Sequence, residues 1–474
     1  MPQQQTRIVI VGAGFSGLAT AYELQSRLPE AEITLLETQQ RVGGMLWSER
    51  VDDFLAEVGP VSFPGNRLGV MKLCHRLKLT NQLITPGPAF RKRLILHHDG
   101  VIQLIPTTLG KAMTSPLFGM GSAFRLLTER LRFSGAKKNK HDESIYQFIE
   151  RRVGTELAVL LGDALGTDQF AGDGRSISVR TGFPQLARSE QQFGNVLGGY
   201  PRLLQAEREA AAKAGIALTD DWMGHYSFKE GMRTLVDALH AQLKQAPHLG
   251  VGVQSIVQAA DGLPHRWLVR CSDGQTRPAD MVVLACPAPK QAAILADLDT
   301  ELADTIMSIP HADVISLAMG YRSDQVPGYV ASHSLLVPQR FKRDVLRMMF
   351  PSSYFPGRAG EGNVLLQMTM GGWQRKEMLS WEDDALIIAA RRELRNLLKI
   401  VKPPQFVHLT RWPKAIPQYT LGHGLRVSKI EEQSKKHRGL YLGGNAYYGI
   451  TLHDCAMQAE RLARLVRDDV KAPL

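Results

Sequence analysis

The sequence predicts an α/β protein whose principal sheet is assembled from segments that lie far apart in the chain. A β-branched run at 8–11 leads into a glycine-rich turn and a helical apolar pattern, which together indicate strand, turn and helix. The continuous apolar run at 281–286 is typical of a central strand of a parallel sheet. The chain then closes, over 440–466, with another strand, glycine turn and helix. These three segments favour one discontinuous Rossmann-like domain.

The first glycine turn is suited to a dinucleotide. Gly12 permits a tight turn, Gly14 lets the backbone approach a pyrophosphate, and Gly17 lets the helix pack closely on the strand. The helix that follows opens at Phe15 and Ser16, and the positive end of its dipole favours phosphate. We therefore expect all five residues at a cofactor site.

A second strand supports this reading. The run at 32–37 ends at Glu37, 20 positions after Gly17, where an acceptor for a ribose hydroxyl is required. Arg41, Gly43 and Gly44 then form a second glycine turn with a cation, which suits the far side of a pyrophosphate and which an NAD site does not need. The context, rather than the glycine spacing alone, predicts a dinucleotide site.

Composition excludes several classes of protein. The 474 residues are 44% hydrophobic and carry a formal charge of +11, so disorder and a disulfide miniprotein are excluded, and the length indicates two or three lobes. The four cysteines have neither zinc-ligand nor disulfide-framework spacing, so no metal is expected and a reducing compartment is favoured. We find no signal-like start and no apolar stretch of membrane-spanning length, which predicts a cytoplasmic protein. The net charge leaves nucleic acid, anionic lipid and an acidic small substrate open.

The segment 103–140 mixes apolar residues with cations and ends in a basic tail at 125–140. Two readings stand side by side: a helix lying on a membrane surface, and an ordinary amphipathic helix packed on its own domain. The rest of the chain predicts helices over 143–214, strands over 251–286 and a mixed region over 299–412. The domains we expect are a dinucleotide-binding domain at 1–88, 215–298 and 413–474, a helical domain at 89–214, and a mixed α+β substrate domain at 299–412.

Seven motifs spread over nearly the whole chain together resemble one family. They are 12–17 (GAGFSG), 36–44 (LETQQRVGG), 57–63 (EVGPVSF), 170–173 (FAGD), 228–232 (FKEGM), 417–423 (PQYTLGH) and 444–455 (GNAYYGITLHDC). The set is similar to oxygen-dependent protoporphyrinogen oxidases, a branch of the FAD-dependent amine oxidase superfamily. The last two motifs are the most diagnostic, because amine oxidases and carotenoid desaturases differ there.

The resemblance implies FAD as cofactor and a porphyrinogen as substrate. Protoporphyrinogen IX would lose three pairs of electrons as hydride to flavin N5, with oxygen as acceptor giving hydrogen peroxide, in heme biosynthesis. A methylene bridge between pyrroles gives up hydride readily, so no catalytic side chain is expected. The alternatives are the same reaction on coproporphyrinogen III, an amine oxidase or carotenoid desaturase on the same scaffold, and a porphyrin or heme carrier without activity.

The resemblance also assigns residues. Further contacts with FAD are expected from Gly59, Pro60, Val253, Trp412, Gly444, Gly449, Ile450 and Thr451. The substrate contacts are expected from Arg93 facing a propionate, from carbonyls of Phe170, Ala171 and Gly172 facing pyrrole N–H groups, and from apolar Leu336, Met349 and Met370. His453 and Asp454, near the expected flavin, are read as helix-capping residues rather than a catalytic pair.

Partners follow from the same resemblance. Besides the porphyrinogen and molecular oxygen, it implies transfer of product to a ferrochelatase, and no nucleic-acid partner. An anionic membrane surface on the inner face of the cell membrane is a partner under the first of the two interpretations of 103–140, and a homodimer is a further expected association.

Overall fold

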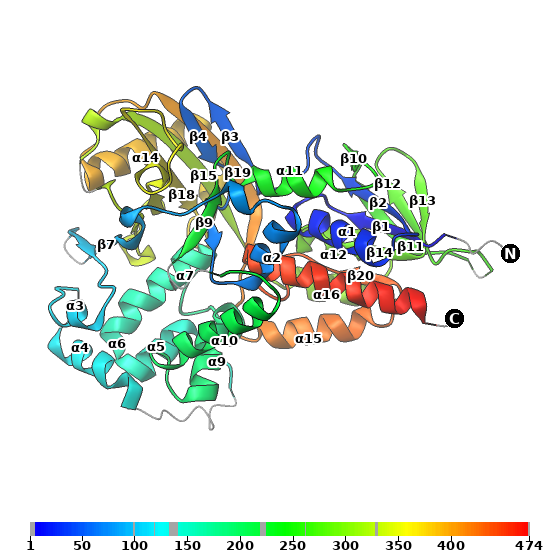
Figure 1. Cartoon of the computed structure of the whole chain (residues 1–474), viewed down its shortest axis with the longest axis horizontal. Coiled ribbons are helices and arrows are strands. Elements are labelled where there is room, and N and C mark those ends of the chain that lie inside the picture. The colour runs from blue at the N-terminus through cyan, green and yellow to red at the C-terminus, as the bar shows by residue number, and fades with distance from the viewer. Residues whose placement is uncertain are drawn as a thin grey trace.

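The computed structural model describes residues 5–97, 100–117, 119–131, 141–218, 224–260, 262–327 and 330–472. It has two large sheets, one at each side of the molecule, and a group of helices beneath the second sheet (Figure 1). Both termini lie beside the first sheet in Figure 1. Within the described residues, no helix combines the length and the apolarity needed to cross a bilayer.

The first sheet has five parallel strands in the order β10-β2-β1-β14-β20. β1 pairs on one side with β2 and on the other with β14, so the segment at 281–286 is a central strand, as predicted. The strands are β1 (Arg7–Val11), β2 (Glu32–Glu37), β10 (His248–Leu249), β14 (Met281–Leu284) and β20 (Leu440–Leu442).

Successive side chains of β1 point to opposite faces of this sheet, and each face is covered by its own apolar core. Ile8 and Ile10 pack into one core with helices, and Val9 and Val11 pack into another on the opposite face. The first core involves α1 (Phe15–Arg27), α2 (Leu68–Arg76), α11 (Arg233–Ala241) and α16 (Leu452–Lys471). The second involves β11 (Val253–Gln258), β12 (Trp267–Cys271), β13 (Thr276–Ala279), α12 (Ala288–Leu295), α13 (Thr300–Met307) and α15 (His423–Ser434).

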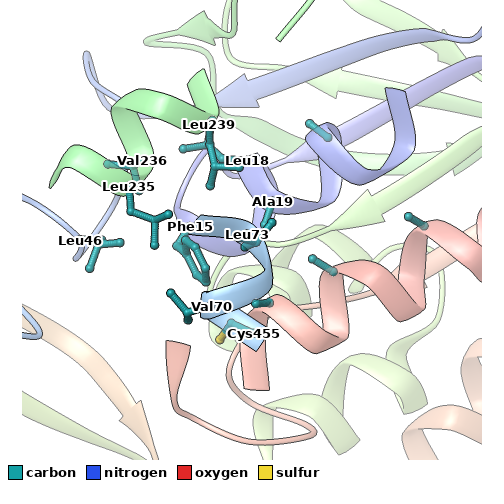
Figure 2. Close-up of a cluster of buried hydrophobic side chains, with 14 of the residues drawn as sticks. Phe15, Leu18, Ala19, Leu46, Val70, Leu73, Leu235, Val236, Leu239 and Cys455 are labelled. Atoms are coloured by element: carbon teal, nitrogen blue, oxygen red, sulfur yellow. The ribbon is translucent and has the colours of Figure 1, made fainter. Parts of the chain in front are cut away.

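The start of α1 packs against apolar residues from three other helices. Figure 2 shows Phe15 and Leu18 of α1 among Val70 of α2, Leu235 of α11 and Cys455 of α16. Phe15 is buried in this core. Complete burial of each such side chain stabilises the fold by about 1.5–3 kcal/mol, so these contacts help to fix the start of α1 next to the glycine turn.

The second sheet has seven strands in the order β19-β15-β18-β17-β16-β7-β8. α14 (Asp383–Leu398) covers one of its faces over an apolar core. The strands are β7 (Arg93–Leu96), β8 (Ile102–Leu104), β15 (His311–Arg322), β16 (Ser334–Leu336), β17 (Val345–Met349), β18 (Asn363–Gly371) and β19 (Phe406–Pro417). β7 and β8, which sequence analysis grouped with the helical domain, pair with this sheet because Arg93 and Leu94 lie beside Ser334 and Leu335.

The helical region lies beside β7 and confirms the helices predicted over 143–214. Its members are α3 (Leu109–Met113), α4 (Met120–Leu127), α5 (Ile145–Val153), α6 (Thr155–Leu157), α7 (Asp163–Phe170), α8 (Val179–Gly182), α9 (Pro184–Phe193) and α10 (Gly199–Lys213). Short strands connect the regions: β3 (Ser48–Val51), β4 (Phe54–Glu57), β5 (Phe63–Pro64), β6 (Leu83–Ile84) and β9 (His225–Phe228). Residues 118 and 132–140 of the predicted amphipathic segment lie outside the described residues.

Candidate active site

The three glycines of the first turn have different surroundings. A Cβ on Gly12, whose φ is +99°, would lie 2.9 Å from the Cys286 backbone nitrogen, and one on Gly17 would lie 1.8 Å from the Gly12 carbonyl oxygen. A Cβ on Gly14 would meet no heavy atom within 4 Å. Packing therefore requires Gly12 and Gly17, whereas Gly14 borders open space at the N-terminus of α1, where a pyrophosphate fits.

Glu37 is oriented at the carboxyl end of β2 by two backbone amides. Its Oε2 accepts the Ala13 N–H at 2.7 Å, and its Oε1 accepts the Gln39 N–H at 2.9 Å. A carboxylate oxygen has a further lone pair, so either can still accept a ribose hydroxyl. This is the geometry that the acidic strand end predicts.

The second glycine turn lies against the first. The Gly43 N–H donates to the Ala13 carbonyl at 2.8 Å, and Gly14 and Gly43 form a parallel bridge. Arg41 donates from Nη1 to the Gly44 carbonyl at 3.0 Å. Burial lowers the pKa of Arg41, against the opposing charge of Glu37. The second turn thus places a cation beside the first turn, at Gly12, Gly14 and Gly17, which we call the glycine cradle.

The amides of the glycines near the C-terminus are hydrogen-bonded within the protein. The Gly444 N–H donates to Gln458 Oε1 at 3.0 Å, and the Gly449 N–H donates to Tyr419 Oη at 2.9 Å. Thr451 is the N-cap of α16, and its own N–H donates to Asp454 Oδ2 at 3.2 Å. These three amides therefore donate within the protein, and contacts of 444–451 with a flavin stay a prediction. Ile450 lies between them, partly buried.

Asp454 and His453 have structural roles. Asp454 and Thr451 form a capping box, as expected. His453 Nδ1 accepts the Gly69 N–H at 2.9 Å, which joins α16 to α2. The two side chains are therefore not arranged as a catalytic pair.

Gly59 and Trp412 join the two large regions. A Cβ on Gly59 would lie 2.2 Å from the Met45 carbonyl oxygen, and the Gly59 carbonyl accepts Gln367 Nε2 of β18 at 3.3 Å. Trp412 Nε1 donates to the Val58 carbonyl at 2.9 Å. Pro60, next in the chain, is exposed.

Two other predicted cofactor residues are placed by their neighbours. The buried side chain of Phe15 points into the core of Figure 2, which leaves its backbone, with that of Ser16, at the turn. Val253 begins β11 just after Val251, whose N–H donates to the Glu37 carbonyl at 2.8 Å. Val253 therefore lies near the ribose end of the cradle.

One face of the seven-stranded sheet contacts α7 and the segment around Gly59. Paired residues of neighbouring strands share a face. The register aligns two rows on this face: Arg93, Ser334, Met349 and Gln367 in one, and Ile95, Leu336, Arg347 and Thr369 in the other. The structure thus brings Arg93, Leu336 and Met349 together on one face of the sheet.

We call this face of the seven-stranded sheet, with its two rows of residues, the wall. Met370 does not belong to it. It is completely buried in the core beneath α14, on the opposite face of the sheet, while its neighbour Thr369 faces the site. The expectation for Met370 is therefore wrong, because successive side chains of a strand point to opposite faces.

The three carbonyls of the loop at Phe170–Gly172, expected to face pyrrole N–H groups, each already accept a hydrogen bond from the protein. Gln418 Nε2 donates to the Phe170 carbonyl at 2.8 Å, and Gln339 Nε2 donates to that of Gly172 at 2.8 Å. The Trp373 N–H donates to the Ala171 carbonyl at 2.8 Å. Each carbonyl has one lone pair left for a pyrrole N–H, so the protein has already used half of the expected acceptor capacity.

Sequence analysis missed Arg347 and Asp168. Arg347, in β17, donates from Nη1 to Asp168 Oδ1 of α7 at 2.8 Å. Burial alone would raise the pKa of Asp168, but the charges of Arg347 and Arg93 hold that pKa below its ordinary value. The signal was present, because Arg347 is a single cation within an otherwise apolar strand.

The glycine cradle, the acidic end of β2 and the adjoining cationic turn define a flavin-dependent oxidoreductase. Comparison with known families supports this class. The model of the family described as "Flavin containing amine oxidoreductase" matches residues 15–467, and the chain belongs to that family. FAD is its cofactor, and the predicted resemblance to porphyrinogen oxidases is confirmed.

Individual relatives cover nearly the whole chain. Protoporphyrinogen oxidase of Bos taurus is 30% identical over 484 residues, covering 97% of this chain and 98% of its own. Coproporphyrinogen III oxidase of Bacillus subtilis is 25% identical over 472 residues, covering 97% of each chain. A crystal structure from Exiguobacterium sp. 255-15, assigned as a protoporphyrinogen oxidase, has a TM-score of 0.81 at 22% identity and covers 98% of this chain and 99% of that chain, which shows the shared fold.

Proposed function

We propose that this protein oxidises protoporphyrinogen IX to protoporphyrin IX with FAD, with oxygen as the final acceptor. The observation that carries the proposal is the wall formed by Arg93, Leu336 and Met349, on the face of the seven-stranded sheet where Gln367 donates to the Gly59 carbonyl. A cation beside two apolar side chains suits a flat macrocycle that bears a propionate. The names of the two curated relatives support a porphyrinogen as substrate.

When bound, FAD supplies the acceptor for a hydride. The residues of this chain bind, orient and shield the substrate. Leu336 and Met349 contact the macrocycle, and Arg93 holds a propionate. His333 lies beside Arg93, and burial with the charge of Arg93 lowers the pKa of His333 well below its ordinary value. His333 is neutral at pH 7 and adds no charge to the wall.

Coproporphyrinogen III is the alternative substrate. It carries four propionates where protoporphyrinogen IX carries two, so it needs more cations around the pocket. Mixing the oxidised protein with each porphyrinogen without air, and following flavin absorbance and porphyrin fluorescence, separates the two. We expect faster bleaching with protoporphyrinogen IX.

Three other results would contradict the proposal. A faster reaction with coproporphyrinogen III would reassign the substrate. Bleaching by an amine or a carotenoid but by neither porphyrinogen would assign the other branches of the superfamily, and no bleaching by any of them would indicate a carrier. Hydrogen peroxide formed on readmission of air tests oxygen as the acceptor.

We also propose contact with an anionic membrane surface through α4. Met120, Phe124 and Leu127 are exposed, by 85%, 61% and 38%, and their spacing places them along one side of the helix. Leu117 is buried against Leu336 and is therefore part of the core, not of a lipid-facing surface. The homodimer, the transfer to ferrochelatase and the lack of a nucleic-acid partner stay predictions.

A further inference from the structure

Three buried hydrogen-bond donors on the site side of the seven-stranded sheet have no partner among the described residues: Arg93 Nε, Arg347 Nε and Tyr354 Oη. A buried donor left without an acceptor destabilises the folded state, because it has lost its hydrogen bonds to water. Three such donors on adjoining elements indicate an acceptor that the protein itself does not supply.

The donors come from neighbouring parts of one surface. Arg93 is paired with Ser334, which is paired with Met349, while Arg347 is two residues before Met349 in the same strand. Strands β7 and β17 are two steps apart, or about 10 Å, which two arginine side chains readily bridge.

Tyr354 closes this surface. It packs in one cluster with Met349, and its ring centroid lies 5.2 Å from that of His333, which is next in sequence to Ser334. Tyr354 is only 3% exposed, and burial raises its pKa, so its hydroxyl stays protonated and can donate.

The charges identify the missing acceptor. Arg93 and Arg347 supply two positive charges, and Asp168, bound to Arg347 Nη1, supplies one negative charge. His333 is neutral at pH 7. The pocket is therefore left with one positive charge and three free donors, which match one carboxylate.

We propose that Arg93, Arg347 and Tyr354 form a pocket that binds a single propionate carboxylate of the tetrapyrrole. The inference rests on the proposed function and adds two binding residues to Arg93. Asp168 holds Arg347 in place from α7, so Arg347 Nε remains available to the ligand. Leu336, paired with Arg347 across the strands, lies beside the pocket for the apolar macrocycle.

The test compares an acid with its ester, because the ester keeps the macrocycle and removes the charge. Variants R93M, R347M and Y354F are titrated with protoporphyrin IX and with its dimethyl ester in the same detergent, and binding is followed by porphyrin fluorescence. We expect R93M and R347M to weaken binding of the diacid about tenfold or more, and Y354F about threefold to tenfold. Binding of the ester should change by less than twofold.

R343M is the matched control, because Arg343 pairs with Glu393 of α14, away from the pocket. It should behave as wild type with both ligands. R347K should retain part of the preference for the acid. Flavin absorbance and the thermal midpoint show whether each variant is folded, and Y354F keeps both arginines if R347M fails to fold.

Equal losses for acid and ester, or none in Y354F and R347M, would overturn the inference. The proposed function fails by a different result, namely that wild type binds the porphyrin but is not bleached by either porphyrinogen. Since binding and bleaching are measured separately, the two failures are distinguishable.

Discussion

Arg358 and Glu57 form an ion pair in which neither side chain has appreciable contact with solvent, with Nη1 and Oε1 3.2 Å apart. Glu57 also accepts the Met232 N–H at 2.9 Å, and Arg358 Nη2 donates to Ser227 Oγ at 2.5 Å. Burial raises the pKa of Glu57, against the charge of Arg358. The pair joins three segments distant in sequence, between the glycine cradle and the seven-stranded sheet.

Removing one member of this pair should destabilise the protein strongly. We expect R358M to lower the free energy of unfolding by about 3–5 kcal/mol, because Glu57 is left buried without its counter-charge. Urea unfolding measures the loss, and R322M, which removes a pair that is more than half exposed, should change stability by less than about 1 kcal/mol. Equal midpoints for R358M and wild type would contradict this.

Substitutions at Gly14 and Gly17 should separate cofactor binding from folding. G14L should fold with the thermal midpoint of flavin-free wild type and purify without flavin absorbance, because its side chain enters the space reserved for pyrophosphate. G17L should lose both flavin and stability through its contact with the Gly12 carbonyl. G110L, at another glycine with open surroundings, is the control. Yellow G14L protein would refute the assignment of the cradle.

Replacing Ala171 by glycine should stabilise the protein. Its φ of +46° is left-handed, which costs an L-residue about 1–2 kcal/mol, partly offset because glycine has more freedom when unfolded. We expect A171G to gain about 0.5–1 kcal/mol by urea unfolding. A187G, within α9, should lose about 1 kcal/mol. A loss in both variants would show that Ala171 is not strained.

Two buried histidines should make stability depend on pH. Burial, with the charge of Arg67, lowers the pKa of His453 to about 3, and burial with Arg426 lowers that of His423 to about 4. Both are neutral when folded, whereas the unfolded chain gains protons below about pH 6.5. Stability should therefore fall from pH 7.5 to 5.5, by about 1.4 kcal/mol for each histidine at pH 5.5.

The histidine effect is measured by urea unfolding at the two pH values. H453Q and H423F should each reduce the loss by about 1.4 kcal/mol, the second keeping a ring stacked on Tyr419. H75Q, at an exposed position, should retain the full dependence. An unchanged slope in H453Q and H423F would show that other groups cause it.

Changing the exposed side chains of α4 should weaken binding to anionic vesicles. A variant with Met120, Phe124 and Leu127 changed to serine should remain in the supernatant on sedimentation with such vesicles, whereas wild type should sediment with them. L425S removes a similarly exposed apolar side chain from α15 and should sediment as wild type does. Equal sedimentation of both variants would contradict a role for α4.

Much of the cofactor region was predictable because its signals are local. The turn at Gly12, the strand ending at Glu37 and the capping box at Thr451 each follow from a few adjacent residues whose backbone geometry the sequence restricts. The return of the strand at 281–284 was also predictable, since a strand buried on both faces is apolar throughout.

The substrate wall depended on tertiary structure. Which face of β18 carries Met370, and which strand brings Arg347 to Asp168, are set by pairing between segments far apart in the chain. A shift of one residue in such pairing reverses every side chain. The sequence by itself determined the flavin cradle through local geometry. Only the folded arrangement of β7, β16, β17 and α7 decided which side chains face the substrate, because burial and charge pairing there arise from contacts between distant segments.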